Sequence, residues 1–257
     1  MQKWPLIFLF AVLSFSCSKK ESGEWHPELI AHAAGVIDGY TYTNSREAFD
    51  RAVKNGYRFI EFDFSFTADS VLVATHTWRE YNVAVGCEHR GDSAPLSVDF
   101  ISQKLYGRYS TLTAEQVNKL FEENENLFLV TDIMSDADIL ERYFPLLKER
   151  MVVEAFSYKD YIELKHRGYF LVLYSCLAKD LEQTIVRHML LHHFFDGEKV
   201  EWIALHASAF DNTLFKLVNA LCSFKIALFT VNNISEVPCK YRNNIEMLYT
   251  DTILPLK

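Results

Sequence analysis

Two histidines and a pair of acidic residues have types and spacings that suit metal-assisted proton transfer. Glu61 and Asp63 are two residues apart in the apolar run FIEFDFSF. In a β-strand alternate side chains share a face, so both carboxylates point to the same side. Such a pair repels unless a cation lies between its members. His32 ends the run LIA upstream and His76 ends the run VLVAT downstream. The pattern predicts a metal site flanked by two groups that can move protons near neutral pH.

The elements that must position these residues are predicted strands and helices, which alternate along the chain. Such alternation predicts a parallel sheet, and because the chain has no GxGxxG motif, a closed (β/α)8 TIM barrel of one domain is favoured over a dinucleotide-binding fold. A barrel has eight strand positions, so either residues 71–76 or residues 247–251 should pair outside the simple count. The predicted strands end at nine residues, namely His32, Ser65, His76, Asp132, Phe156, Tyr174, His206, Val231 and Asp251.

Helices are predicted where capping residues precede apolar residues at helical spacing. Asn44 and Glu47 read as a capping box for a helix that Gly56 closes. The predicted helix at residues 180–195 carries His192 and His193 on its surface. Residues 78–112 show no regular pattern and are expected to form a long loop over the C-terminal face of the barrel. Further helices are predicted after Thr113 and Ser157 and over residues 136–150.

The N-terminal run MQKWPLIFLFAVLSFSC is too short to span a membrane and fits a secretory signal. Residues 13–17 are similar to a bacterial lipoprotein processing site. We therefore expect a lipoprotein signal peptide at 1–16, a lipid on Cys17, a polar tether at 17–26 and the barrel at 27–257. We expect the protein to be exported to the bacterial cell envelope, where it would lie on the outer membrane or face the periplasm. The alternative is an ordinary signal peptide with an incidental cysteine.

Composition limits the classes of partner. The 257 residues are 49% hydrophobic, which suits one large core, and the formal net charge is −8. Nucleic acid and an anionic bilayer surface are therefore poor partners for the domain. The remaining cysteines, Cys87, Cys176, Cys222 and Cys239, form no zinc-binding spacing and are expected to be free thiols.

The segments IAHAAG, YTNSREAF, FIEFDFSFTADSVLVATH and LFLVTDI together resemble the glycerophosphodiester phosphodiesterases. The resemblance is closest to an uncharacterised bacterial branch within the phosphatidylinositol-specific phospholipase C superfamily, and it covers nearly the whole mature chain. It implies a (β/α)8 barrel, a divalent cation, Ca²⁺ or Mg²⁺, held by Glu61, Asp63 and Asp132, and catalysis by His32 and His76. From the residues alone, Asp132 could instead cap the helix that follows it.

Two departures from the family pattern affect the expected phosphate site. Ala33 stands where the family has arginine, and Met134 stands where it has lysine. Arg79, Arg90 and Lys159 are candidates to replace these cations. His206, which ends the run WIALH, is a further substrate-binding candidate because its strand should end on the same face.

The sequence therefore predicts a metal-dependent phosphodiesterase that acts on glycerophosphodiesters or related lipid head-group phosphodiesters. His32 is assigned as the base that deprotonates the attacking hydroxyl, and His76 as the acid that protonates the leaving oxygen. The alternative is a non-catalytic binding lipoprotein that keeps the metal cradle on the same barrel.

Overall fold

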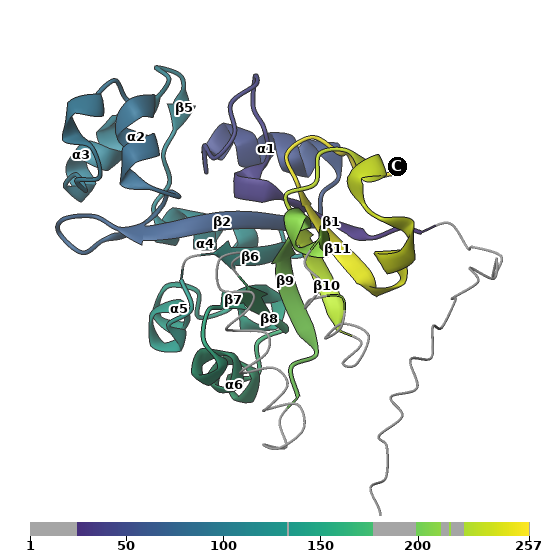
Figure 1. The fold of residues 1–257 in the computed structure, drawn as a ribbon. Helices are drawn as coiled ribbons and strands as arrows, with labels where there is room; N and C mark the ends of the chain where they lie inside the picture. Colours follow the sequence, from purple (N-terminus) through teal and green to yellow (C-terminus); the bar gives the residue numbers. More distant parts are fainter. Residues whose placement is uncertain (1–24, 133, 177–198, 212–215, 217–223, 257) are drawn as a thin grey trace, which may run out of the picture.

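The computed structural model describes residues 25–132, 134–176, 199–211, 216 and 224–256. Its parallel strands close into a barrel because β1 pairs with both β11 and β2 (Figure 1). This confirms the predicted TIM barrel, and the predicted strand ends are correct to within two residues. The barrel strands are β1 (Glu28–Ala31), β2 (Phe59–Phe66), β6 (Phe128–Asp132), β7 (Met151–Ala155), β8 (Leu171–Cys176), β9 (Trp202–His206), β10 (Lys225–Phe229) and β11 (Ile245–Thr250).

The alternation of side chains along β2 divides the core into two layers. Ile60, Phe62 and Phe64 point outward into the large cluster that the helices cover. Phe59 points inward and packs with apolar residues of the other strands inside the barrel. Glu61 and Asp63 follow Phe59 at intervals of two, so they also face the barrel interior. The apolar strand therefore delivers two carboxylates to the C-terminal end of a closed barrel.

The ninth strand, β3 (Leu72–Ala74), does not belong to the parallel barrel. It pairs antiparallel with the end of β2, where Phe64 lies opposite Ala74. Of the two segments expected outside the barrel count, residues 71–76 are therefore the correct one. The hairpin returns the chain to the C-terminal face, so His76 emerges beside the acids of β2.

The helices outside the barrel begin at polar caps and end where the sequence breaks them. The Thr113 hydroxyl and the Gln116 side chain form the predicted capping box of α4 (Ala114–Glu122). Ser157 caps α6 (Tyr158–Arg167), and Asp136 caps α5 (Ala137–Tyr143). The helix predicted over 136–150 is thus shorter than expected, because Pro145 cannot continue a helix.

The N-cap of the first helix, α1 (Arg46–Asn55), lies one residue later than predicted. Ser45 is the N-cap and accepts a hydrogen bond from the backbone N–H of Ala48, whereas Asn44 has a left-handed φ of 47°. An N-cap residue needs an extended backbone, so Asn44 cannot fill that role. Glu47 forms no capping box because its carboxylate accepts hydrogen bonds from the backbone and hydroxyl of Ser110.

The expectation of a structureless loop over residues 78–112 is wrong. This segment contains α2 (Trp78–Ala84), α3 (Ser97–Ser102) and the small hairpin of β4 (Lys104–Leu105) and β5 (Tyr109–Ser110). We call residues 78–110 the insert; it stands beyond the end of β2 (Figure 1). Its helices are held together by the rings of Tyr81 and Phe100, which stack at 4.9 Å. These contacts join residues far apart in sequence, so local patterns do not reveal them.

Some sequence predictions fall on residues that the structure does not describe. Cys17 and the signal peptide lie there, as do His192 and His193. In the described part, Cys87 and Cys239 are free thiols. Among the helices that the structure describes, none has the length and apolar character needed to cross a membrane.

Candidate active site

Three carboxylates meet at the C-terminal end of the barrel. Glu61, Asp63 and Asp132 each offer an oxygen within 4.8 Å of the others. The register of β2 against β6 places Asp63 directly opposite Asp132. Burial, together with the charges of Asp63 and Asp132, raises the pKa of Glu61 well above its usual value. Burial also raises the pKa of Asp63. Such a cluster of acids is stabilised in its ionised form by a cation.

The hydrogen bonds of the two β2 acids leave room for such a cation. Ala33 donates its backbone N–H to Oε2 of Glu61 at 2.7 Å, and Asn44 donates its amide to Oδ2 of Asp63 at 2.8 Å. The other oxygen of Asp63, Oδ1, is buried and has no hydrogen-bond partner among the described residues. A buried carboxylate oxygen without a donor is costly, and a divalent cation would satisfy it. The residues therefore fit a hard, oxygen-coordinated metal ion.

Asn44 orients Asp63 rather than capping a helix. The Asn44 amide donates to the Asp63 carboxylate, and its carbonyl oxygen accepts the backbone N–H of Asp63 at 3.0 Å. Both contacts are buried. The amide thus fixes the side chain and the backbone of the same acid, which explains why the strained backbone at Asn44 is tolerated.

His32 is held by a chain of polar residues from the closing strands. Its Nδ1 lies 2.9 Å from Oδ1 of Asp251, and the other carboxylate oxygen accepts the Asn232 amide at 2.7 Å. Burial opposes ionisation of Asp251, but the hydrogen bonds from His32 and Asn232 outweigh it and lower the Asp251 pKa. An ionised Asp251 favours the proton on Nδ1 of His32, which leaves Nε2 as the base. That Nε2 lies 4.0 Å from Glu61 Oε2.

His76 has a similar arrangement on the opposite side. Its Nδ1 lies 2.7 Å from Oε2 of Glu80, which also accepts the Thr77 hydroxyl. Burial lowers the pKa of His76, but the charge of Asp63 and the hydrogen bond to Glu80 outweigh it, so the pKa is raised. A raised pKa keeps His76 protonated at higher pH, as a general acid requires.

Tyr42 links the two histidines and was not identified from the sequence. Its ring centre lies 4.7 Å from that of His32 and 4.7 Å from that of His76. Tyr42 stands in the loop between β1 and α1, two residues before Asn44. The motif YTNSREAF drew attention to Asn44 and Glu47 but not to Tyr42, since nothing local distinguishes an aromatic residue in a site from one that packs a loop.

Glu154 is a fourth acid that the sequence analysis missed. It lies buried in β7, where the Tyr249 hydroxyl donates to its carboxylate. Burial and the charge of Asp132 raise the pKa of Glu154 to about 8. The available signal was a glutamate inside the apolar run MVVEAF, at an inward-facing strand position. Glu154 therefore adds to the cluster an acid whose ionisation burial and the neighbouring charge of Asp132 oppose.

The three predicted substrate-binding residues have other contacts. Arg79 forms a two-bond ion pair with Asp92, and both side chains are exposed. Lys159 is exposed on α6. His206 lies at the end of β9, where its Nδ1 bonds the Ser208 hydroxyl at 2.7 Å. The structure thus brings His32, His76 and the acids together, whereas Arg79 is paired with Asp92 and His206 with Ser208.

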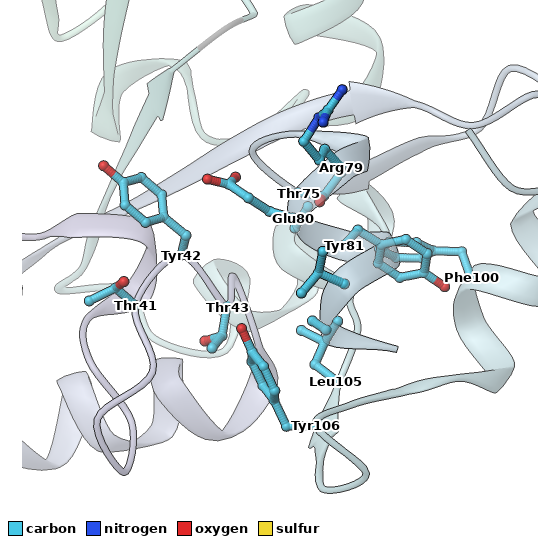
Figure 2. Close-up of a pocket in the computed structure, with 13 residues that line it drawn as sticks. Thr41, Tyr42, Thr43, Thr75, Arg79, Glu80, Tyr81, Phe100, Leu105 and Tyr106 are labelled. Carbon is cyan, nitrogen blue, oxygen red and sulfur yellow. The ribbon is translucent and has the colours of Figure 1, made fainter. Parts of the chain in front are cut away.

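A pocket of about 350 Å³ lies between the β1–α1 loop and the insert, and its lining includes Tyr42 and Glu80, which contact the histidines. Figure 2 shows Thr41, Tyr42 and Thr43 on one side and Leu105 and Tyr106 below. Hydroxyl groups and aromatic rings dominate its lining. Its charged residues are engaged elsewhere, since Glu80 binds His76 and Arg79 binds Asp92. The pocket therefore suits a neutral or cationic group better than an anionic one.

Comparisons with known proteins identify relatives of this barrel. The model of the glycerophosphoryl diester phosphodiesterase family matches residues 36–244. A putative enzyme of that name from Agrobacterium tumefaciens is 16% identical, covering 88% of this chain and 94% of its own, with a TM-score of 0.63. One from Parabacteroides distasonis is 18% identical, covering 89% and 94%, with a TM-score of 0.61.

A third solved structure contains a ligand. It is an Oleispira antarctica phosphodiesterase in complex with the product sn-glycerol-3-phosphate, 17% identical, covering 88% of this chain and 93% of its own, with a TM-score of 0.60. No curated protein sequence matches the chain significantly.

Proposed function

Because this chain belongs to the glycerophosphoryl diester phosphodiesterase family, we propose that it hydrolyses glycerophosphodiesters or related lipid head-group phosphodiesters. One observation carries the proposal: two histidines, each hydrogen-bonded to a carboxylate, lie beside a cluster of three further acids. The family name supports a phosphodiester substrate. The product complex of the Oleispira relative supports a glycerol phosphate portion.

Glu61, Asp63 and Asp132 would hold a divalent cation, either Ca²⁺ or Mg²⁺. When bound, such an ion polarises a phosphoryl oxygen and offsets the negative charge of the phosphate. The protein contributes the geometry of the site: Ala33 fixes Glu61, Asn44 fixes Asp63, and the strand register places Asp132 opposite Asp63.

His32 would deprotonate the attacking hydroxyl, and His76 would protonate the leaving oxygen. Asp251 and Glu80 each bind an Nδ1, so both Nε2 atoms are left for proton transfer. The raised pKa of His76 supports its role as the acid. The pocket beside His76 suits the departing alcohol, and its volume of about 350 Å³ exceeds what a glycerol group alone requires.

A catalytically inactive binding protein is the second candidate. Ala33 and Met134, which replace the cationic residues of the family pattern, favour it. In the structure the backbone N–H of Ala33 donates a hydrogen bond to Glu61, and Met134 packs against the core. Neither residue supplies a positive charge to a phosphate. The retention of both histidines with their carboxylate partners favours the enzyme.

A panel of phosphodiesters distinguishes the two candidates. We expect release of the alcohol from glycerophosphocholine or glycerophosphoinositol when Ca²⁺ or Mg²⁺ is present, and loss of this activity after chelation. The measurement is alcohol release by a coupled or chromatographic assay. Binding of the diesters without turnover, under all metal conditions, would identify the binding protein instead.

We also propose that the mature chain is an exported, lipid-anchored protein of the bacterial cell envelope that begins at Cys17. Mass spectrometry of protein purified from native membranes should find no residue before Cys17 and the added mass of acyl chains. A Cys17→Ser variant should be lost from the membrane fraction. An unmodified N-terminus at another residue would contradict the proposal.

A further inference from the structure

Tyr42 occupies the space between the two proton-transfer residues. Its ring lies edge-on to His32, with an interplanar angle of 79°, and tilted against His76 at 35°. The side chain remains 36% exposed, so a ligand at the site can reach it. A substrate that extends from one histidine to the other must therefore pass along Tyr42.

Both ring neighbours of Tyr42 are bound to acids, His32 to Asp251 and His76 to Glu80. Burial, together with the charges of Asp251, Asp63, Glu61 and Glu80, raises the pKa of Tyr42 to about 12. Figure 2 shows the hydroxyl turned away from Leu105 and Tyr106, which also line the neighbouring pocket. At neutral pH the group is a protonated hydrogen-bond donor.

The backbone holds this side chain in place at a cost. Tyr42 has a φ of 54°, in the left-handed region that residues with a side chain seldom adopt. Asn44 two residues later is also left-handed and is clamped to Asp63 by two buried hydrogen bonds. The hydrogen bonds between Asn44 and Asp63 therefore fix the conformation of this loop, and with it the position of the Tyr42 ring, relative to the acids.

The site needs donors if it is to hold a phosphodiester. The described groups that surround it are mainly carboxylates, and the nearest arginine on the pocket wall, Arg79, is paired with Asp92. A phosphodiester has two non-bridging oxygens, and a cation in the cradle would approach one of them. We propose that the Tyr42 hydroxyl donates a hydrogen bond to a non-bridging phosphoryl oxygen of the substrate. The inference rests on the proposed function and assigns Tyr42 as a substrate-binding residue.

The Tyr42→Phe variant tests this directly because it keeps both ring contacts and removes only the hydroxyl. A hydrogen bond to a charged group corresponds to a loss of ~10- to 100-fold on removal. We expect sn-glycerol 3-phosphate to bind Tyr42→Phe more weakly by that factor, measured calorimetrically with saturating Ca²⁺ or Mg²⁺. The kcat/KM for glycerophosphocholine should fall by a similar factor.

Tyr40→Phe is the matched control, since it deletes a hydroxyl from the same loop while the Tyr40 ring remains stacked on Tyr106. It should bind and turn over as the native protein does. A Tyr42→Leu variant separates ring from hydroxyl. Native-like affinity and turnover in Tyr42→Phe, with losses only in Tyr42→Leu, would assign Tyr42 to packing the histidines and overturn the proposal.

The binding measurement separates this inference from the proposed function. If the native protein binds sn-glycerol 3-phosphate but hydrolyses no diester, the enzymatic proposal fails, and the affinity of Tyr42→Phe still decides the role of the hydroxyl. If the native protein hydrolyses diesters and Tyr42→Phe is unchanged, only the Tyr42 inference fails. A native protein that neither binds nor hydrolyses these compounds overturns both.

Discussion

Replacing His76 with alanine is expected to slow hydrolysis of an alkyl phosphodiester by ~10²- to 10⁴-fold. An alkoxide leaves poorly without a proton, and the Glu80-bound His76 is placed to supply one. A nitrophenolate leaves without protonation, so the glycerophosphoryl nitrophenyl ester should be hydrolysed by His76→Ala at nearly the native rate. The measurement is kcat/KM for both esters.

His32→Ala is the comparison variant, because removal of the base should impair both esters. A second comparison uses pH. A general acid works while protonated, so activity on the alkyl ester should fall as pH rises through the His76 pKa. Glu80→Gln removes a charge that raises this pKa, and the fall should begin at lower pH. Equal losses on both esters for His76→Ala would assign the residue to binding or structure.

Neutralising the metal cradle should abolish the response of the protein to divalent cations. The Glu61→Gln/Asp63→Asn double variant keeps the size of both side chains and removes their charges. A cation that binds only the folded state adds ~2.7 kcal/mol at a concentration 100 times its Kd, so the native Tm should rise with Ca²⁺ or Mg²⁺. The Tm of the double variant should not respond, and its turnover should fall by at least ~10²-fold.

The pH dependence of stability without bound cation provides an independent test, because there the two ionised acids should destabilise the fold. The pKa values of Glu61 and Asp63 are raised in the folded state, so their ionisation destabilises the fold. The chelated native protein should therefore lose stability as pH rises above the ordinary carboxylate range, and the double variant should lose less. Glu122→Gln/Glu123→Gln on the exposed face of α4 is the charge-matched control. Identical cation responses in native protein and cradle variant would show that the cation binds elsewhere.

The alternation of strands and helices predicted the barrel, and the strand pattern together with the family resemblance predicted the grouping of His32, Glu61, Asp63, Asp132 and His76. The reason is that each ends or lies within a short apolar strand, and the carboxyl ends of parallel strands meet at one face. No tertiary detail is needed for that inference. Residues on strands are positioned by the period of the strand, which the sequence displays directly.

Features that depend on contacts between distant segments could not be predicted. The helices of the insert are held together by the stacking of Tyr81 on Phe100. The left-handed backbone of Asn44 prevents it from capping a helix, and its side chain instead donates a hydrogen bond to Asp63. Glu154 was missed because a single acid inside the apolar run MVVEAF lacks the paired spacing of Glu61 and Asp63. Tyr42 was missed because its two ring neighbours, His32 and His76, follow β1 and β3 and are brought to it only by the fold.

The β2–β3 hairpin gives the two histidines different structural foundations. His32 follows a strand hydrogen-bonded on both sides within the closed barrel, whereas His76 follows a three-residue strand that leads into the insert. Opening of the barrel strand requires global unfolding, but a small peripheral unit can open locally at lower free energy. The acid could therefore be withdrawn by a local fluctuation while the base and the acidic cradle stay assembled. In such an enzyme the attack and the departure of the alcohol would respond separately to temperature, denaturant and substitutions in the insert.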